Sequence, residues 1–343
     1  MEPIYQFATP QSIENQKAAQ SKQAQDATDQ TASCQNCKES KTDRSSTTTT
    51  LLAIAMLLVT GFCTSFSATA QTAFASNNGP NKPSKDNKSD VAIRSLDDIV
   101  FPELEFKRGA YLKLRTVYVD VPVSKFKIKP FPANSSAETR AELDFLLHLQ
   151  KTRNAEAVNR TETMANVYFD PLTTNPADAD YTRNINSLFY IGRDLGPWFN
   201  AQQLPVTSQV LQQVIQDATY YIFSLKADFS RPRPYQLDSR LENLEAPGHA
   251  SYPSGHSSTS HVHAYILSHI FPEYKDHFMG VASDMAFSRE TRGVHYPSDS
   301  EAGKEFARQF VDELMKSRQF RTDLEAMKAE IVQVRAANQL TKK

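Results

Sequence analysis

Cysteine is scarce in this chain and is confined to one end of it. Among 343 residues, only Cys34, Cys37 and Cys63 are cysteines. Cys34-x-x-Cys37 has no second pair of metal ligands nearby, so we interpret it as two incidental thiols rather than a zinc or redox site. If the N-terminal region is removed, no cysteine remains, and a packed core without disulfide bonds must stabilise the protein.

The chain also has no excess of charge of either sign. Lysine and arginine together number 38, and aspartate and glutamate together number 39. This balance lacks the broad positive field that non-specific nucleic-acid binding requires, so no nucleic-acid partner is predicted. Any cluster of cations must be local, which makes its position in the sequence informative.

Long apolar runs are missing as well. A membrane-spanning helix needs about 20 apolar residues, whereas the run Leu51–Phe62 has only 12. Basic residues precede this run, and small residues at Ala70 and Ala75 follow it, which is the order of parts in a secretory signal. We therefore expect cleavage near one of these alanines and export to the periplasm or the medium, with no stable membrane partner. If residues 51–75 are retained, they anchor the chain in the membrane.

Composition divides the chain into four parts. Residues 1–50 are rich in Gln, Ser, Thr, Asn and Lys and bury too little apolar surface to fold. They are predicted to be a disordered N-terminal extension. Residues 51–75 are the signal peptide or anchor, residues 76–95 are a flexible linker, and residues 96–343 are the folded domain.

Helical periodicity dominates the folded domain. Between Thr207 and Leu225, apolar residues recur at the i, i+3, i+4 spacing of an amphipathic helix. The weak alternation of Tyr111–Val123 fits either a short strand or an extended arm. With no βαβ alternation and no internal repeat, the sequence predicts an all-α fold, a helical bundle with its motifs at helix ends. Further helices are expected from Ser135 onwards and over 154–168, 184–192, 257–270, 274–288, 298–315 and 321–337.

Three of the expected helix starts carry N-cap signals. Ser135-x-x-Glu138 and Ser298-x-x-Glu301 have the spacing of capping boxes. Ser254 directly precedes an apolar-periodic run and is the third predicted N-cap. This third start has a further consequence, because the free N–H groups and the dipole at a helix N-terminus bind anions.

Three short segments in the last third of the chain supply groups that bind and attack a phosphate. The first carries Lys226, at the end of an expected helix, and Arg233, whose proline neighbours fix the local backbone. A guanidinium presents a planar fork to phosphate oxygens. Arg231 is the rival for this role, and the six residues between Lys226 and Arg233 favour Arg233. Taken alone, either cation is more commonly a solvated surface charge.

The second segment is Pro253-Ser254-Gly255-His256. Gly255 lets the backbone approach a ligand closely, and the helix start offers backbone N–H groups to an anion. His256 would then lie beside the bound anion. By itself, this histidine fits a capping or surface role equally well.

The third segment places Arg289 at the end of one helix, His295 after a turn, and Asp299 in the first turn of the next helix. The His295-x-x-x-Asp299 spacing can set the carboxylate against one imidazole nitrogen. That contact would fix the tautomer and leave the other nitrogen free to attack. Asp299 also suits the positive end of a helix dipole, and the two roles are compatible.

No metal site or cofactor is predicted. His261 and His263 lie two positions apart on an expected helix, so their side chains point about 200° apart and cannot easily share one ion. His249 is near the second segment and is a further candidate for lining the site. The other histidines have no paired ligands.

Together, the three segments match the three-part signature of the PAP2 phosphatase superfamily, which also includes vanadium haloperoxidases and membrane lipid phosphatases. The stretch Ser251–Ser257 (SYPSGHS) resembles the secreted bacterial class A non-specific acid phosphatases. The similarity covers roughly residues 130–335 and is strong at the motifs and loose between them. The resemblance implies a helical bundle that hydrolyses small phosphomonoesters without a metal or another cofactor. It is also compatible with a homo-oligomer.

The resemblance also implies a role for each site residue. His295 would be the nucleophile that forms a phosphohistidine, and Asp299 would orient it. His256 would protonate the leaving oxygen and then activate water. The phosphoryl oxygens would be bound by Lys226, Arg233, Arg289 and the backbone N–H groups of Ser254 and Gly255.

Two alternatives stay open. A vanadium haloperoxidase would use His295 to hold vanadate, although such proteins are typically much longer. A phosphate-binding protein without turnover would need the cations but neither His256 nor Asp299. A lipid phosphatase is excluded, because it would need several apolar spans that residues 76–343 do not contain.

Overall fold

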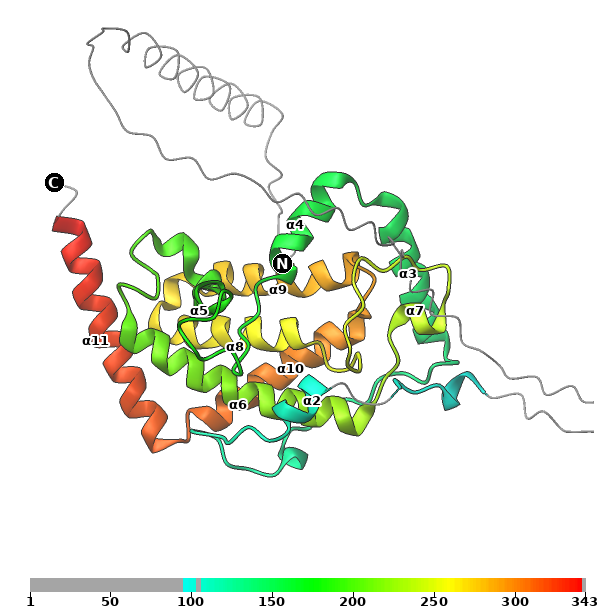
Figure 1. Cartoon of the computed structure of the whole chain (residues 1–343), viewed down its shortest axis with the longest axis horizontal. Helices are drawn as coiled ribbons and strands as arrows, with labels where there is room; N and C mark the ends of the chain where they lie inside the picture. Colours follow the sequence, from blue (N-terminus) through cyan, green and yellow to red (C-terminus); the bar gives the residue numbers. More distant parts are fainter. Residues whose placement is uncertain (1–94, 103–105, 341–343) are drawn as a thin grey trace, which may run out of the picture. The chain divides into compact units, whose positions relative to one another are not determined.

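The computed structural model in Figure 1 describes residues 95–102 and 106–340, all within one structural unit of the chain, Asp86–Lys343. The predicted extension 1–50, the signal or anchor 51–75 and nearly all of the linker 76–95 lie outside the described residues. The described part contains helices and no strand, so the predicted all-α fold is confirmed. None of its helices is both long and apolar enough to cross a lipid bilayer.

The helices are joined by connections of very different length, and a long one leads from α7 to α8. The α-helices are α2 (Phe106–Tyr111), α3 (Ala137–Thr152), α4 (Ala155–Ala165), α5 (Tyr181–Ser187), α6 (Pro205–Phe229), α7 (Pro234–Leu237), α8 (Gly255–Ile270), α9 (Lys275–Thr291), α10 (Pro297–Leu314) and α11 (Arg318–Leu340). The 3₁₀ helices are η1 (Leu96–Asp98), η2 (Val123–Lys125), η3 (Tyr190–Leu195) and η4 (Pro272–Tyr274).

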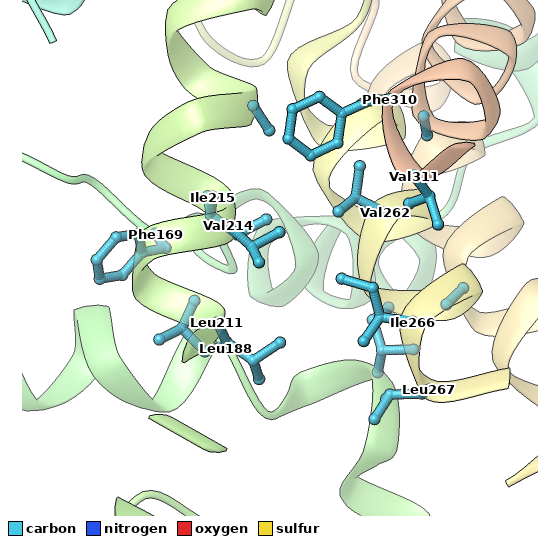
Figure 2. Close-up of a cluster of buried hydrophobic side chains, with 14 of the residues drawn as sticks. Phe169, Leu188, Leu211, Val214, Ile215, Val262, Ile266, Leu267, Phe310 and Val311 are labelled. Atoms are coloured by element: carbon cyan, nitrogen blue, oxygen red, sulfur yellow. The ribbon is translucent and has the colours of Figure 1, made fainter. Parts of the chain in front are cut away.

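Helix α8 is the centre of the bundle. It packs against α6, α9 and α10, and most of its residues are buried (Figure 1). Figure 2 shows that buried side chains of three helices gather in one hydrophobic cluster. They come from α6 (Leu211, Val214, Ile215), α8 (Val262, Ile266, Leu267) and α10 (Phe310, Val311). Each such aliphatic side chain contributes roughly 1.5–3 kcal/mol when it is fully buried. The periodicity that predicted a helix over Thr207–Leu225 therefore marks the face of α6 that builds the core.

The segment after α2 is an extended arm, and the strand alternative is wrong. The backbone N–H groups of Val117, Tyr118 and Val119 donate to the carboxylate of Asp217, at 2.7, 2.7 and 2.9 Å. Tyr221 adds a hydrogen bond from its hydroxyl to the carbonyl of Val119. Two side chains of α6 thus take the place of a neighbouring strand, and α6 fixes the position of the arm.

The start of α3 differs from the prediction by one residue. Its N-cap is Ser136, whose Oγ accepts a hydrogen bond from the N–H of Thr139 at 3.1 Å. Ser135 instead donates from its N–H and its hydroxyl to the carboxylate of Asp97. The neighbouring serines are equivalent in sequence, and a contact with a distant segment decides between them.

The other two helix starts have opposite outcomes. Ser254 is the N-cap of α8, as predicted, and accepts from the N–H of Ser257. Ser298 does not cap α10, because that helix already begins at Pro297, a residue suited to the first helical position. The Ser298 hydroxyl is bonded to Glu142 of α3 instead.

Gly303 allows α10 to approach the N-terminus of α8 closely. A Cβ atom at this position would lie 2.8 Å from the carbonyl oxygen of Ser254 and 2.9 Å from the Cβ of Ser257. Both atoms belong to the first turn of α8 or its cap, and neither can swing away. The contact therefore ties α10 to the helix start that carries the second sequence motif.

We predict that Gly303→Ala destabilises the protein by about 1–3 kcal/mol, because the added methyl forces the two helices apart. Gly280→Ala is the matched control. Gly280 lies within α9, where an added Cβ atom would have no neighbour within 4 Å, so alanine there should raise stability by up to about 1 kcal/mol. Urea unfolding followed by circular dichroism measures both. Equal effects of the two substitutions would contradict this account of the α8–α10 contact.

Candidate active site

Six of the eight predicted site residues line one cavity with a volume of about 370 Å³. They are Lys226, Arg233, Gly255, His256, Arg289 and His295. The remaining two, Ser254 and Asp299, are fully buried next to this cavity. The structure thus brings together groups from the ends of α6, α8, α9 and α10.

Lys226 and Arg233 are fully buried, so the surface-charge interpretation is wrong for both. The ammonium of Lys226, in the last turn of α6, donates to the carbonyls of Ala250 and Ser251 at 2.8 and 2.9 Å. Helix α6 ends at Ser230, which adopts the left-handed conformation with φ 46°. This reversal turns the chain back, so that Arg233 reaches the same cavity as Lys226.

Arg233 is held by several acceptors. Its Nε donates to the carbonyl of His249 at 3.0 Å, and its Nη1 donates to the carbonyl of Val294 at 2.6 Å. Nη1 also lies 3.0 Å from Nε2 of His295, and Nη2 lies 3.0 Å from Nδ1 of His249. Burial lowers the pKa of Arg233 to about 10, so the guanidinium stays charged at neutral pH.

His295 and Asp299 form the predicted pair. Nδ1 of His295 lies 2.9 Å from Oδ2 of Asp299, and the carboxylate also accepts from the Ser251 hydroxyl at 2.5 Å and from the N–H of Tyr296 at 3.1 Å. Burial alone would raise the pKa of Asp299, but Arg231 and the hydrogen bonds from His295 and Ser251 hold that pKa well below its usual range. An ionised Asp299 is an acceptor only, so the Nδ1 proton stays on His295.

The same contacts leave Nε2 of His295 as the nitrogen with a lone pair. Burial, and then the charge of Arg233, holds the pKa of His295 well below its ordinary value. The imidazole is therefore neutral over a wide pH range, and its Nε2 lone pair accepts a hydrogen bond from Nη1 of Arg233 in this structure. Asp299 also lies in the first turn of α10, so it serves both roles expected from the sequence.

Arg231 has a different role from the one considered for it in the sequence. It does not line the cavity, and its Nη1 donates to Oδ1 of Asp299 at 2.7 Å. Its Nη2 pairs with Glu142 at 3.0 Å, and its guanidinium lies 3.7 Å from the ring centre of Tyr296. Arg231 is therefore the buried counter-ion of Asp299, while Arg233, two residues later, faces the cavity.

His256 lies in the first turn of α8. Its Nε2 is 3.0 Å from the carbonyl of Ala165, so this nitrogen carries a proton and donates a hydrogen bond to that carbonyl. Nδ1 is then the nitrogen that can exchange a proton with a ligand. Burial lowers the pKa of His256 to about 4, and the charges of Lys226 and Arg233 act in the same direction.

Arg289 has unused hydrogen-bonding capacity. Its Nη2 is paired with Glu245, while its buried Nε and Nη1 have no hydrogen-bond partner among the described residues. Burial lowers the pKa of Arg289 to about 9, and the neighbouring Arg233 and Arg292 add to this shift. Buried donors without a partner cost about 1–3 kcal/mol each. An anion in the cavity would relieve this cost.

The two backbone donors expected at the start of α8 are not equivalent. The N–H of Ser254 already donates to the carbonyl of Asp299 at 3.0 Å. Gly255 is at the cavity wall. Of this pair, Gly255 is thus the one placed to meet a ligand, and Ser254 instead joins the cap of α8 to α10.

Several cavity residues escaped the sequence motifs. They are Tyr111, Ala165, Tyr168, Phe223 and the run Glu245–His249. Only His249 had a signal, its closeness to the second motif, and it does line the cavity. His261 and His263 are buried within α8, and the described residues include no group of three or more His, Cys, Asp or Glu side chains placed to share a metal ion.

Comparison with known proteins agrees with the motifs. Residues 206–307 match the sequence model of the PAP2 superfamily. This region is therefore similar to PAP2 superfamily domains. It contains every predicted site residue, so the resemblance inferred from the three segments is confirmed for this part of the chain.

Similar proteins include two bacterial non-specific acid phosphatases. That of Salmonella typhi is 33% identical over 145 residues, which cover 38% of this chain and 56% of the relative. That of Providencia stuartii is 27% identical over 137 residues, covering 38% and 55%. The chain thus spans little more than half the length of these relatives. Among solved structures, a bacterial vanadium-dependent iodoperoxidase is 18% identical with a TM-score of 0.43, over 57% of this chain and 53% of the other.

We predict that Arg231→Met destabilises the protein by about 3–5 kcal/mol, because it leaves Asp299 as a buried charge without its counter-ion. Arg308→Met is the control. Arg308 makes two exposed ion pairs on α10, and its loss should leave the unfolding midpoint nearly unchanged. Chemical denaturation at pH 7 measures both variants. A stable Arg231→Met protein would show that Asp299 does not depend on this arginine.

Proposed function

We propose that this chain is an acid phosphatase that hydrolyses small phosphomonoesters through a phosphohistidine on His295, without a metal or another cofactor. The observation that carries the proposal is the state of His295. Its Nδ1 is held by the ionised Asp299, its Nε2 lies 3.0 Å from Nη1 of Arg233, and its side chain lines the cavity. A neutral imidazole with a directed lone pair, beside cations that attract phosphate, is arranged for attack on phosphorus.

Phosphate binding is supported by the cations of the cavity. Phosphoryl transfer depends mainly on positioning and on charge neutralisation around the equatorial oxygens. Lys226, Arg233 and Arg289 converge on one cavity, and two donors of Arg289 lack a partner among the described residues. The N–H of Gly255 at the start of α8 is the proposed fourth contact.

The proposed reaction has two steps. In the first, Nε2 of His295 forms a bond to phosphorus while the ester P–O bond breaks, and the protonated His256 gives its Nδ1 proton to the leaving oxygen. Asp299 stabilises the positive charge that develops on the phosphorylated imidazole. In the second step, water attacks phosphorus, His256 accepts a proton from it, and the P–N bond breaks to release inorganic phosphate and regenerate His295.

The comparisons support this choice among the activities considered. Residues 206–307, which match the PAP2 superfamily, contain all the residues proposed for the chemistry, and two similar proteins are named non-specific acid phosphatases. We also propose that the enzyme acts outside the cytoplasm. That proposal rests on the signal-like order of basic, apolar and small residues before Ser76.

Rapid quenching of a nitrophenyl phosphate reaction in EDTA tests the mechanism. His295→Ala should form no phosphoenzyme. His256→Ala should accumulate an acid-labile phosphohistidine, because a good leaving group needs little proton donation while hydrolysis of the intermediate still lacks its base. His269→Ala, on the exposed end of α8, should behave like the unaltered protein. Labelling of His295→Ala to the same extent would place the nucleophile elsewhere, and activity that needs a divalent ion would refute the metal-free mechanism.

The pH dependence tests the role of His256. The pH profile of kcat/KM reports the free enzyme and that of kcat reports the substrate complex. His256 must be protonated to act, and burial lowers its pKa to about 4 in the free protein, so the falling limb of kcat/KM should begin at low pH. A bound phosphate dianion offsets the nearby cations and raises this pKa. The falling limb of kcat should therefore lie at higher pH. An alkyl phosphate is the substrate to use, since it needs the acid. Profiles still rising above pH 8 would exclude His256 as the acid.

A further inference from the structure

Three aromatic rings line the part of the cavity wall that the proposed phosphate chemistry does not use. Tyr111, Tyr168 and Phe223 all line the cavity. The ring of Tyr168 lies 5.2 Å from that of His256, and the ring of Phe223 lies 5.1 Å from that of His249. The rings are therefore next to two histidines of the site rather than in a separate part of the core.

The reaction geometry indicates what these rings would contact. Attacking and leaving groups lie roughly in line in phosphoryl transfer, so the leaving oxygen is opposite Nε2 of His295 and close to the proposed acid, His256. The carbon skeleton of the leaving group then begins beside His256. Tyr168 and Ala165 are the neighbours of His256 there, since the Tyr168 ring lies against its imidazole and Ala165 accepts its hydrogen bond.

The cavity has room for more than a phosphate. Its volume of about 370 Å³ is at the lower end of the roughly 300–1,000 Å³ typical of small-molecule sites. A phosphoryl group with one ring-sized substituent suits this volume better than a long chain does. The polar anchors belong to the phosphate, so the rest of the space is bounded mainly by the three rings and by Ala246 and Pro247.

Tyr111 is held firmly in this wall. Its hydroxyl donates to Oδ1 of Asp170 at 3.1 Å, and its ring lies 4.4 Å from that of Phe223 at an angle of 56°. Tyr111 is 3% exposed. A ring fixed in this way loses little freedom when a ligand contacts it.

We propose that Tyr111, Tyr168 and Phe223 form a leaving-group subsite that selects phosphomonoesters of aromatic alcohols over those of small alkyl alcohols. This inference rests on the proposed function, because it uses the assigned direction of the leaving group. Tyr111 and Tyr168 precede residues 206–307, the region that matches the PAP2 superfamily. Two of the three rings are thus supplied to this region by the segments before it.

Binding of phosphonates tests the subsite without turnover, because their C–P bond is not hydrolysed. Calorimetry in EDTA on the full chain would compare phenylphosphonate, ethylphosphonate and inorganic phosphate. Aromatic contacts of this kind correspond to about 2- to 10-fold in affinity, so phenylphosphonate should bind tighter than ethylphosphonate by about that factor. Tyr111→Leu should bring the ratio close to one, and Tyr111→Phe should retain it. The affinity for inorganic phosphate should not change in either variant.

Tyr118→Leu is the matched control. Tyr118 lies on the arm that follows Tyr111, is also buried, and packs its ring against Phe320 rather than into the cavity. It should keep the phenyl-to-ethyl ratio of the unaltered protein. Equal affinities of the two phosphonates for the unaltered protein overturn the subsite alone, as does a ratio that Tyr111→Leu leaves unchanged. If neither phosphonates nor phosphate bind, the proposed function fails together with the subsite.

Discussion

The buried ion pair between Arg231 and Asp299 is the interaction on which the rest of the site depends. Both side chains are fully buried, and a buried charge is tolerated only when it is paired and hydrogen-bonded. Asp299 also orients His295 through Oδ2 and accepts the N–H of Ser254 through its backbone carbonyl. One residue thus joins the turn after α6, the cap of α8 and the start of α10, and it decides which nitrogen of His295 faces the cavity.

In the cavity, by contrast, positive charges outnumber their negative partners. Lys226, Arg233 and Arg289 are buried close to one another, and the pKa values of both arginines are lowered, first of all by burial. Glu245 offsets part of this charge by pairing with Arg289. The fold thus keeps repulsion between neighbouring cations, and it keeps donors of Arg289 that have no partner among the described residues. An anion bound in the cavity would remove both costs. Such local cost at a site is a common trade between stability and activity.

The features that could be predicted from the sequence are those that local patterns determine, namely helix positions and the residues of the three motifs. Helical periodicity predicted α6. The spacing of the motifs predicted that five side chains share one site, and the structure places all five at one cavity: Lys226, Arg233, His256, Arg289 and His295. The spacing from Lys226 favoured Arg233 over Arg231 for the cavity, but it could not show that Arg231 pairs with Asp299, which depends on how the helices pack. Ser135 and Ser136 posed the same problem, which Asp97 resolves. Tyr111 and Tyr168 gave no signal, since nothing local shows that a ring will reach a cavity built by later helices.

Helix α6 explains how residues so distant in sequence keep their register. It carries Lys226, a proposed phosphate ligand, and Phe223 of the aromatic wall, less than one turn apart. The same helix holds the arm after Tyr111 through three hydrogen bonds to Asp217. The ring of Tyr111 is therefore placed relative to Phe223 and Lys226 by one rigid element. Buried charges constrain the groups proposed for the chemistry, whereas Tyr111 and Tyr168 precede residues 206–307 and lie outside the ion pair of Arg231 and Asp299. This division would let the choice of alcohol vary while the attack on phosphorus stays the same.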